Sequence, residues 1–505
     1  MKTPILGQSY VARSVNAADN RMINLYPEVL IEGKEAAFLQ RAPGLRLVTT
    51  VGNGPIRGMW TFGGYAFVVS GNSLFRFDES LTTVNLGTIV GVGPVSMADN
   101  GVQLFIAANG PSYIYNLSLN VLQQIIDPDF TGATTVGYLD GYFVYNEPNS
   151  QRIYVSALLD GTSIDPTDFA SAEGFPDNVV AVAVDHREMW AFGENSVEVW
   201  YNAGTPDFPL ARISGAFNEI GCLAPYSVAK LDNSLFWLGS DARGNGIVYR
   251  AEGYRGRRVS THAVEWQIQQ YANLGDARAY TYQQDGHAFY VLSFPSANKT
   301  WVYDASTQAW HERAGWDGSQ FVLHRGICQL NYDGQILVGD YENGNVYAFD
   351  MTVYADNGQT QKWLRSWRAL PTGANNLKRT AQHMLQLDME TGVGLNGVDP
   401  MDTVVENEHL DLNFINQIYQ VYEPVTTVQG ANPQVMLRWS DDGGHTWSNE
   451  HWRSIGRIGN YKNRVIWRRL GMTTKLRDRV YEVSGTDPVK IAIIGAELIL
   501  SPTNA

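Results

Sequence analysis

A short pattern of turn and apolar positions recurs along the chain between about Gly63 and Asp350. Each copy starts with a tight turn, continues as an aromatic and aliphatic strand, and is followed by a second such strand, as in residues 285–291 and 300–304. Asn-Gly and Asp-Gly pairs supply the positive φ of hairpin turns, and the flanking residues suit a pleated, half-buried surface. The seven turns begin at Gly63, Asn100, Asp140, Asp185, Asp232, Asp285 and Asp333.

The spacing of these turns indicates the architecture. Successive turns stand 37 to 53 residues apart, which matches four-stranded propeller blades of about 40–50 residues. A single hairpin cannot bury its apolar face alone, so the copies must pack together. We therefore predict an all-β chain with a β-propeller over residues 51–371. Six or seven blades are expected, since the pattern does not distinguish an end copy from a flanking element.

The two flanks differ from the repeats. Residues 1–50 contain a polar run, 13–21, and an extended run, 23–28, that reaches Pro27; we expect an extended arm lying on a neighbouring surface, with a flexible tail as the alternative. Residues 372–505 contain alternating strands, such as 434–439, and few helical stretches. This second flank is predicted to be a separate β-sandwich-like domain.

Composition adds an expectation about partners. Charged residues make up 17% of the chain and aromatic residues 12%, against about 25% charged in an average protein. A large surface so poor in charge suggests that other subunits cover part of it, although a big β protein alone would also fit. The net charge of −14 argues against a protein that wraps nucleic acid by neutralising phosphates.

The sequence offers no sign of secretion or membrane insertion. The first residues, 1–8, lack an apolar stretch of signal-peptide length, and the apolar run 491–500 is interrupted by Glu497. Cys222 and Cys328 are far apart in sequence, so both are expected to be reduced core or strand residues. We expect a chain that is made in a cytoplasm, stays soluble and inserts in no membrane.

Residues 440–447 match the Asp-box pattern Ser-x-Asp-x-Gly-x-Thr-Trp. The carboxylate of such a motif can accept turn amides, while its tryptophan packs on the hairpin. Asp boxes resemble those of sialidases, where they lie away from the catalytic centre, so we interpret this one as a structural turn. Its residues are Ser440, Asp442, Gly444, Thr446 and Trp447.

No pattern predicts catalysis, a cofactor or a metal site. Residues 392–397 are formally G-x-G-x-x-G, but Pro400 follows where a dinucleotide site needs a helix. His311 and Glu312 are a candidate acid–base pair, for which a strand-end histidine is the more ordinary explanation. Two carboxylates could face a propeller centre as in glycosidases, yet no spacing singles out such a pair. We expect a protein that is not an enzyme.

The strongest charge feature lies between Lys462 and Arg479, where seven basic residues stand against Asp478 alone. A solvated strand face would explain it, and an acidic protein partner or transient DNA contact are the alternatives. Interleaved apolar residues favour the protein partner. The predicted interface residues are Arg464, Trp467, Arg468, Arg469, Lys475, Arg477 and Arg479.

Several stretches resemble the packaged-DNA stabilisation family of short-tailed bacteriophages, which are tail hub or nozzle proteins. Most of the N-terminal resemblance lies in 7–14 and 21–28, and further similar stretches are 168–174, 196–201 and 286–292. At the C-terminal end, 464–471 and 477–484 are also similar. The resemblance covers nearly the whole chain.

The resemblance implies a structural virion component, a ring of six copies beneath the portal and adaptor rings. It further implies contacts with a tail fibre or tailspike and with a tail plug or needle protein. Viral double-stranded DNA would pass through the lumen without sequence-specific binding. The alternative is a propeller glycan-binding or sialidase-like glycosidase receptor protein of a phage, which the Asp box and the blades suggest.

Overall fold

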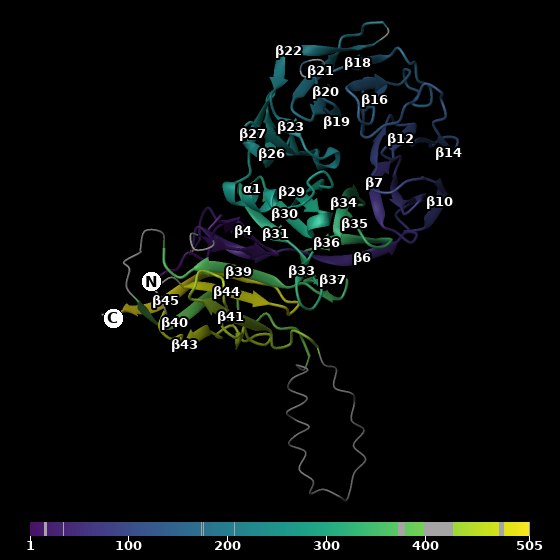
Figure 1. Ribbon diagram of the computed structural model, residues 1–505. Coiled ribbons are helices and arrows are strands. Elements are labelled where there is room, and N and C mark those ends of the chain that lie inside the picture. The colour runs from purple at the N-terminus through teal and green to yellow at the C-terminus, as the bar shows by residue number, and fades with distance from the viewer. Residues whose placement is uncertain are drawn as a thin grey trace, which may run out of the picture. The chain divides into compact units, whose positions relative to one another are not determined.

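The computed structural model describes residues 1–14, 18–33, 35–172, 174, 176–206, 208–371, 379–397, 428–473 and 479–503. The chain forms two compact units (Figure 1). One contains residues 46–310 and 322–349, and the other contains 1–45, 311–321 and 350–505. Strands dominate both units, and α1 (His262–Gln269), capped by the Thr261 hydroxyl, is the single α-helix among the described residues.

The first unit is a propeller built from successive antiparallel sheets. The first blade contains β7 (Ile56–Phe62), β8 (Tyr65–Ser70), β9 (Ser73–Phe77) and β10 (Thr83–Thr88). The second contains β11 (Ser96–Asp99), β12 (Gln103–Ala107), β13 (Ser112–Asn116) and β14 (Val121–Gln124). The third contains β15 (Val136–Leu139), β16 (Tyr142–Asn146), β17 (Arg152–Val155) and β18 (Phe169–Ser171). The fourth contains β19 (Val179–Asp185), β20 (Glu188–Gly193), β21 (Val197–Asn202) and β22 (Leu210–Asn218).

Three further blades complete the circle. The fifth contains β23 (Gly221–Cys222), η1 (Pro225–Ser227), β24 (Ala229–Leu231), β25 (Ser234–Asp241), β26 (Gly244–Glu252) and β27 (Arg255–Arg258). The sixth contains β28 (Arg278–Gln284), β29 (His287–Phe294) and β30 (Lys299–Asp304), with η2 (Pro295–Ala297) between the last two; β31 (Ala309–Arg313) follows in the sheet order. The seventh contains β34 (Gly326–Tyr332), β35 (Gln335–Asp340) and β36 (Asn345–Asp350).

The N-terminal strand β6 (Gly44–Thr50) is the neighbour of β36 in the seventh blade. A strand from before the first blade therefore completes the last one, and β34 lies against β7 to close the ring. The predicted propeller is confirmed with seven blades. The sequence pattern did not fix the number of blades, because β6, which completes the seventh blade, lies before the first turn of the repeat.

The predicted turns join the first and second strands of each blade. Asp285 and Gly286 have φ of 49° and 83°, and Asp333 and Gly334 have 48° and 68°, the left-handed conformation that aspartate and glycine tolerate best. The fourth blade carries His186 and Arg187 at these positions, with φ of 50° and 61°. The turn is kept there although neither residue is a usual turn former.

Aromatic side chains fill the spaces between blades. Phe105 of the second blade lies 5.5 Å from Phe143 and 5.8 Å from Tyr145 of the third, between ring centroids. Both phenylalanines are fully buried. Burial of a phenylalanine side chain contributes about 1.5–3 kcal/mol, so each interblade space stabilises the ring.

The second unit is a β-sandwich of two five-strand groups. One has the order β4 (Leu25–Val29), β5 (Ala37–Arg41), β45 (Ala492–Pro502), β40 (Thr380–Met389) and β43 (Val465–Arg468). The other has the order β3 (Met22–Ile23), β39 (Trp363–Arg368), β44 (Val480–Gly485), β41 (Gln434–Ser440) and β42 (His451–Ser454). Short strands complete the description of the chain: β1 (Tyr10–Val11), β2 (Asp19–Asn20), β32 (Gly315–Trp316), β33 (Phe321–Val322), β37 (Ala355–Asp356) and β38 (Gln359–Thr360).

The structure corrects the expected boundaries. Strands β4 and β5, which were expected in an extended arm on a neighbouring surface, are strands of the sandwich, and Leu25 and Leu39 are buried in its core. Strand β39, which falls inside the predicted propeller range 51–371, supplies Trp363 and Trp367 to the same core. Both segments are apolar on one face, and that face is buried by strands from the far end of the chain.

Candidate functional sites

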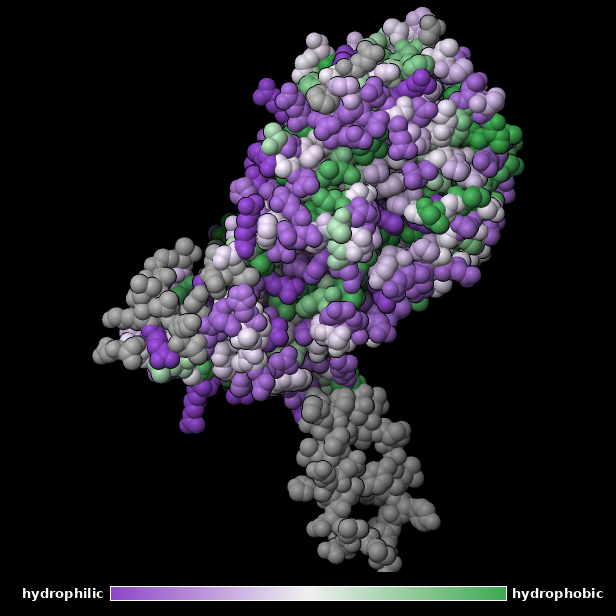
Figure 2. All heavy atoms as spheres, viewed as in Figure 1, coloured by the Kyte–Doolittle hydropathy of each residue, from purple (hydrophilic) through white to green (hydrophobic). Residues whose placement is uncertain are grey.

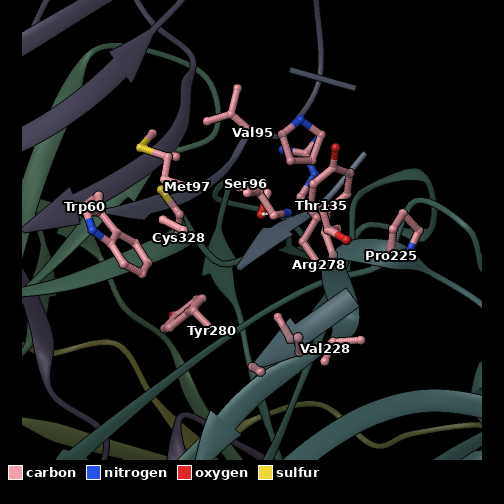
Figure 3. Close-up of a pocket in the computed structure, with 18 of the residues that line it drawn as sticks. Trp60, Val95, Ser96, Met97, Thr135, Pro225, Val228, Arg278, Tyr280 and Cys328 are labelled. Atoms are coloured by element: carbon pink, nitrogen blue, oxygen red, sulfur yellow. Dashed lines mark hydrogen bonds between the residues drawn. The ribbon is translucent and has the colours of Figure 1, made fainter. Parts of the chain in front are cut away.

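A central cavity of about 580 Å³ lies where the inner strands of the propeller meet. All seven blades contribute lining residues. Figure 3 shows Trp60, Met97 and Cys328 on one side of the cavity and Pro225 on the other, with Tyr280 and Val228 across from Val95 and Ser96. Side chains of this size leave a small space rather than an open bore.

Two arginines line this cavity, Arg57 and Arg278. Burial lowers the pKa of both guanidinium groups. The nearby Tyr226 hydroxyl acts in the opposite direction on both pKa values. The pKa of Tyr226 is raised to about 12, chiefly by burial. No local sequence pattern marks these arginines, because only the closure of the ring brings residues 57 and 278 together.

Asp99 is the one carboxylate among the described residues that line the cavity. Its Oδ2 accepts a hydrogen bond from Trp60 Nε1 at 2.8 Å, and its Oδ1 accepts one from the Gly101 amide at 3.0 Å. Glycoside hydrolysis uses two carboxylates that flank the scissile bond. The described lining of the cavity supplies one, which is already engaged.

A ring of acidic turns lies at one mouth of the central cavity. The turns follow the C-terminal ends of the inner strands, so they gather at one end of the propeller. Six of the seven turns carry a carboxylate at or just before the turn: Asp99, Asp140, Asp185, Asp232, Asp285 and Asp333.

Basic side chains offset half of this negative charge. Arg187 Nη2 lies 2.8 Å from Asp140 Oδ1, and Lys230 Nζ lies 2.5 Å from Asp185 Oδ1. Each of these pairs links one blade to the next. Arg250 lies 2.8 Å from Asp232 within the fifth blade. In the described part of the chain Asp285 and Asp333 have no ion pair. Burial raises the pKa of the neighbouring Tyr332, and the negative charges of Glu79, Asp78 and Asp333 raise it further. The turn face therefore stays acidic.

The predicted basic interface is only partly exposed. Arg464, Arg468 and Arg469 are exposed on or beside β43, at the edge of its sheet. Trp467 is 1% exposed and lies in the sandwich core, so its placement in the interface was wrong. Its indole Nε1 donates to the backbone carbonyl of His451 at 2.7 Å.

Arg479 is a second correction, since its side chain is 2% exposed. Its Nε and Nη2 donate to the two carboxylate oxygens of Asp441 at 2.7 and 2.8 Å, and Nη1 donates to the Leu470 carbonyl at 2.6 Å. Lys475 and Arg477 lie outside the described residues.

Arg453 joins the exposed arginines, although it lies outside the basic run. It is exposed on β42 and its Nε donates to the Ile466 carbonyl of β43 at 3.0 Å. Trp452 beside it is 50% exposed. We call Arg453, Arg464, Arg468 and Arg469 the basic edge. No sequence signal marks Arg453, because β42 and β43 belong to different sheets and come together only in the folded sandwich.

The Asp box forms a hydrogen-bonded turn after β41. Asp442 Oδ1 accepts the amides of His445 and Thr446 at 3.0 and 2.9 Å, and Oδ2 accepts the Thr446 hydroxyl at 2.6 Å. Ser440 donates its hydroxyl to Asp442 and accepts the Gly444 amide at 2.8 Å. These bonds hold the pKa of Asp442 well below its usual range. Trp447 donates to the Gly444 carbonyl at 3.1 Å.

The remaining candidates are buried. His311 is fully buried and Glu312 is 6% exposed, with Arg21 Nη2 at 3.6 Å from the Glu312 carboxylate. Burial raises the pKa of the Cys222 and Cys328 thiols to about 12, which makes them poor nucleophiles. The described residues contain no group of three or more histidine, cysteine or acidic side chains suited to a metal. They also contain no helix that is long and apolar enough to cross a bilayer.

The fold and these surfaces define a class of protein: an all-β propeller joined to a β-sandwich, with charged faces and no assembled catalytic group among the described residues. The family model described as bacteriophage P22 Gp10, beta-propeller, matches residues 1–354. The model described as bacteriophage P22 Gp10, beta-sandwich, matches residues 415–500. The chain belongs to this family of structural phage proteins, which confirms the resemblance found in the sequence.

Solved structures show only distant likeness. The computationally designed Ika8 protein is 13% identical over 65% of this chain and 99% of its own, with a TM-score of 0.37. Streptogramin B lyase is 11% identical over 60% and 96%, with a TM-score of 0.39. A chain of the mitotic checkpoint complex is 12% identical over 61% and 93%, with a TM-score of 0.39. No curated protein sequence matches the chain.

Proposed function

We propose that this protein forms the ring-shaped nozzle of a phage tail, beneath the portal and adaptor, where it retains packaged DNA and forms the channel for its ejection. The observation that carries the proposal is membership of the P22 Gp10 family over both units. The ring is proposed to contain six copies, to assemble in the host cytoplasm and to contact a tail fibre or tailspike and a plug or needle protein.

The size of the central cavity indicates where the DNA would pass. A rod only as wide as the DNA major groove, about 12 Å, and one helical turn long, about 34 Å, has a volume of roughly 3,800 Å³. The propeller cavity holds about 580 Å³. This difference supports a channel enclosed by several copies rather than one that runs through a single propeller.

The charge of the protein suits such a channel. A net charge of −14 and the acidic turn face disfavour tight contact with phosphates. DNA would slide past an acidic wall without being held by it. Retention would then depend on steric closure by loops or by the plug protein.

A charge-poor surface on the first two blades supports assembly into a ring. Between residues 80 and 126 the chain has a single charged residue, Asp99. Exposed aliphatic side chains gather there, including Leu119 at 71% and Ile126 at 86% exposure. Figure 2 shows hydrophobic atoms over the side where β10 and β14 lie. We propose that a second copy of this chain covers this surface.

The basic edge supports docking to a protein of opposite charge, which we propose to be the adaptor ring. Arg464, Arg468 and Arg469 stand exposed on an edge strand, and Trp452 adds apolar area next to Arg453. Arginine and tryptophan are enriched where protein interfaces gain most of their binding energy.

DNA retention by heads that lack the protein tests the proposed function. Packaged heads made without it should lose their genome on incubation, so that added DNase degrades the DNA. Addition of the purified protein should restore nuclease protection. Heads that retain their DNA equally well without the protein would contradict the proposed role.

A glycan-binding propeller is the second candidate, because Arg57 and Arg278 line the central cavity. Two cations there could contact an acidic sugar. A screen against sialylated and neutral glycans separates the two functions: sugar-dependent thermal stabilisation that disappears in Arg278→Gln supports glycan binding, and its absence supports the nozzle.

A further inference from the structure

A second cavity, of about 660 Å³, lies beside the first blade. Three glycine-containing loops surround it: residues 52–55 before β7, residues 70–73 between β8 and β9, and residues 91–93 before the second blade. Asn85 of β10 also lines it. None of the described lining residues is acidic, and Arg57 is the one charged side chain among them.

Arg57 is buried, with 5% of its surface exposed. Its Nε donates to the Gly93 carbonyl at 2.7 Å, and its Nη1 donates to the carbonyls of Gly71 and Ile89 at 3.1 and 3.2 Å. These bonds fix the guanidinium between two of the loops. Its Nη2 is buried and has no hydrogen-bond partner in the described chain.

Nη2 lies close to one of the glycines that line the cavity. A Cβ added at Gly91, which lines the cavity, would lie 3.3 Å from Nη2. The unpartnered Nη2 thus lies directly against the backbone of the glycine loop. A Cβ at position 91 would crowd Nη2, so glycine keeps this donor clear of a side chain.

The alternative is that Arg57 has a purely structural role, as Arg41 has in the other unit. Burial of Arg41 is complete, yet all three of its nitrogens donate hydrogen bonds, to Gln361, Tyr354, Asp487 and Val489. Arg57 differs because one nitrogen remains without an acceptor and because no carboxylate contributes to its electrostatic environment. A buried cation is stabilised most by an anion, so an anion is the partner that the remaining Nη2 donor favours.

The loops add donors of a kind that phosphate-binding sites use. In the described chain the backbone amides of Asn53, Gly91, Val92 and Gly93 donate to no other group. Gly52 and Gly54 have φ of 60° and 72°, and Gly91 and Gly93 have 119° and 84°. Successive amides around left-handed residues form anion-binding concavities, and a guanidinium binds phosphate with paired N–H donors.

We propose that this cavity of the first blade, which we call the Arg57 pocket, binds a phosphate group, with Arg57 Nη2 and the loop amides as donors. The phosphate could come from free inorganic phosphate or from a phosphodiester of nucleic acid, which share this chemistry. The site is separate from the acidic turn face, which lies at the opposite ends of the strands.

Titration calorimetry of the whole protein with inorganic phosphate tests the proposal, with sodium chloride used to keep the ionic strength constant. Asn72→Asp places a negative charge on an exposed lining residue. It should weaken phosphate binding about twofold to fivefold, the range for a like charge about 4–10 Å away in water. The matched control, Asn245→Asp, changes an exposed asparagine on β26 and should leave binding unchanged.

Arg57→Gln should reduce binding at least about tenfold, since it removes the charge and the open donor. If this variant does not fold, Asn72→Asp still decides the question. Absence of phosphate binding to the wild type, or equal effects of Asn72→Asp and Asn245→Asp, would overturn the proposal. A short single-stranded oligonucleotide distinguishes the sources: competition with phosphate indicates a phosphodiester ligand, and phosphate binding without competition indicates the free anion.

Discussion

Individual side chains in the sandwich combine charge with burial in a way that sequence does not reveal. Arg479 belongs to a basic run in the sequence, yet its guanidinium is buried against Asp441 and the ring of Trp439, 5.2 Å from its centroid. Trp467, in the same run, lies in the core. Arg468, between them in the sequence, is exposed. Neighbouring basic residues therefore have opposite roles.

Arg479→Met should destabilise the sandwich by about 3–5 kcal/mol, since removal of one partner leaves Asp441 without its bidentate donor. The exposed Arg468→Met should change stability by less than about 0.5 kcal/mol. Calorimetric melting of both variants measures the difference. Equal effects of the two substitutions would show that the Arg479 pair is not a stabilising contact.

Asp442→Ala should destabilise the Asp-box turn by about 1 kcal/mol, because four donors lose their acceptor in a solvated site. The folded pKa of Asp442 is lowered by its hydrogen bonds. Its contribution is therefore fully present above the unfolded pKa of about 3.9 and is lost as the pH falls through the lower folded value. Melting temperature against pH should fall less steeply below pH 4 in Asp442→Ala than in the wild type. Identical pH profiles would contradict this assignment.

At the scale of elements, hairpins were predictable and distant pairings were not. Turn residues such as Asp285 and Gly286 carry a local signal, since few residues tolerate positive φ. The pairing of β6 with β36 joins residues about 300 positions apart, and no local pattern encodes it. The same holds for β4 and β5, which the sequence assigns to an arm and the structure to the sandwich. The Arg57 pocket was equally invisible, because its three loops meet only in the folded blade.

Deletion of residues 1–40 should unfold the sandwich rather than only prevent assembly. It removes β3, β4 and nearly all of β5, together with the buried Met22, Leu25 and Leu39. Leu39→Ala alone should cost about 2–5 kcal/mol. Limited proteolysis of the truncated protein provides the measurement. A truncated sandwich that resists protease would mean that these strands are dispensable for folding.

At the scale of the whole molecule, the proposed function depends on surfaces that several subunits would share. The charge-poor surface of the first two blades and the basic edge belong to different units, so each can be altered by its own substitutions. Reversal of charge in Arg468→Glu with Arg469→Glu should weaken docking to a partner ring at least about tenfold while the propeller stays folded. Binding of the variant to purified adaptor rings measures this, with unchanged circular dichroism as the control. Unaltered docking would make the basic edge a solvated strand face.

Leu119→Asp with Ile126→Asp should prevent association between copies, because the substitution places charge in a surface that a second copy is proposed to bury. Tyr201→Asp, an exposed aromatic on the fourth blade at 44% exposure, is the matched control and should assemble normally. Sedimentation of both variants reports the outcome. Disruption by both, or by neither, would place the contact elsewhere.

The mass of the protein in solution, measured by light scattering with and without portal and adaptor rings, tests the central claim most directly. A hexamer, or a monomer that becomes a hexamer on those rings, is the predicted result. A monomer or trimer that ignores the rings would contradict the nozzle and favour a glycan-binding propeller.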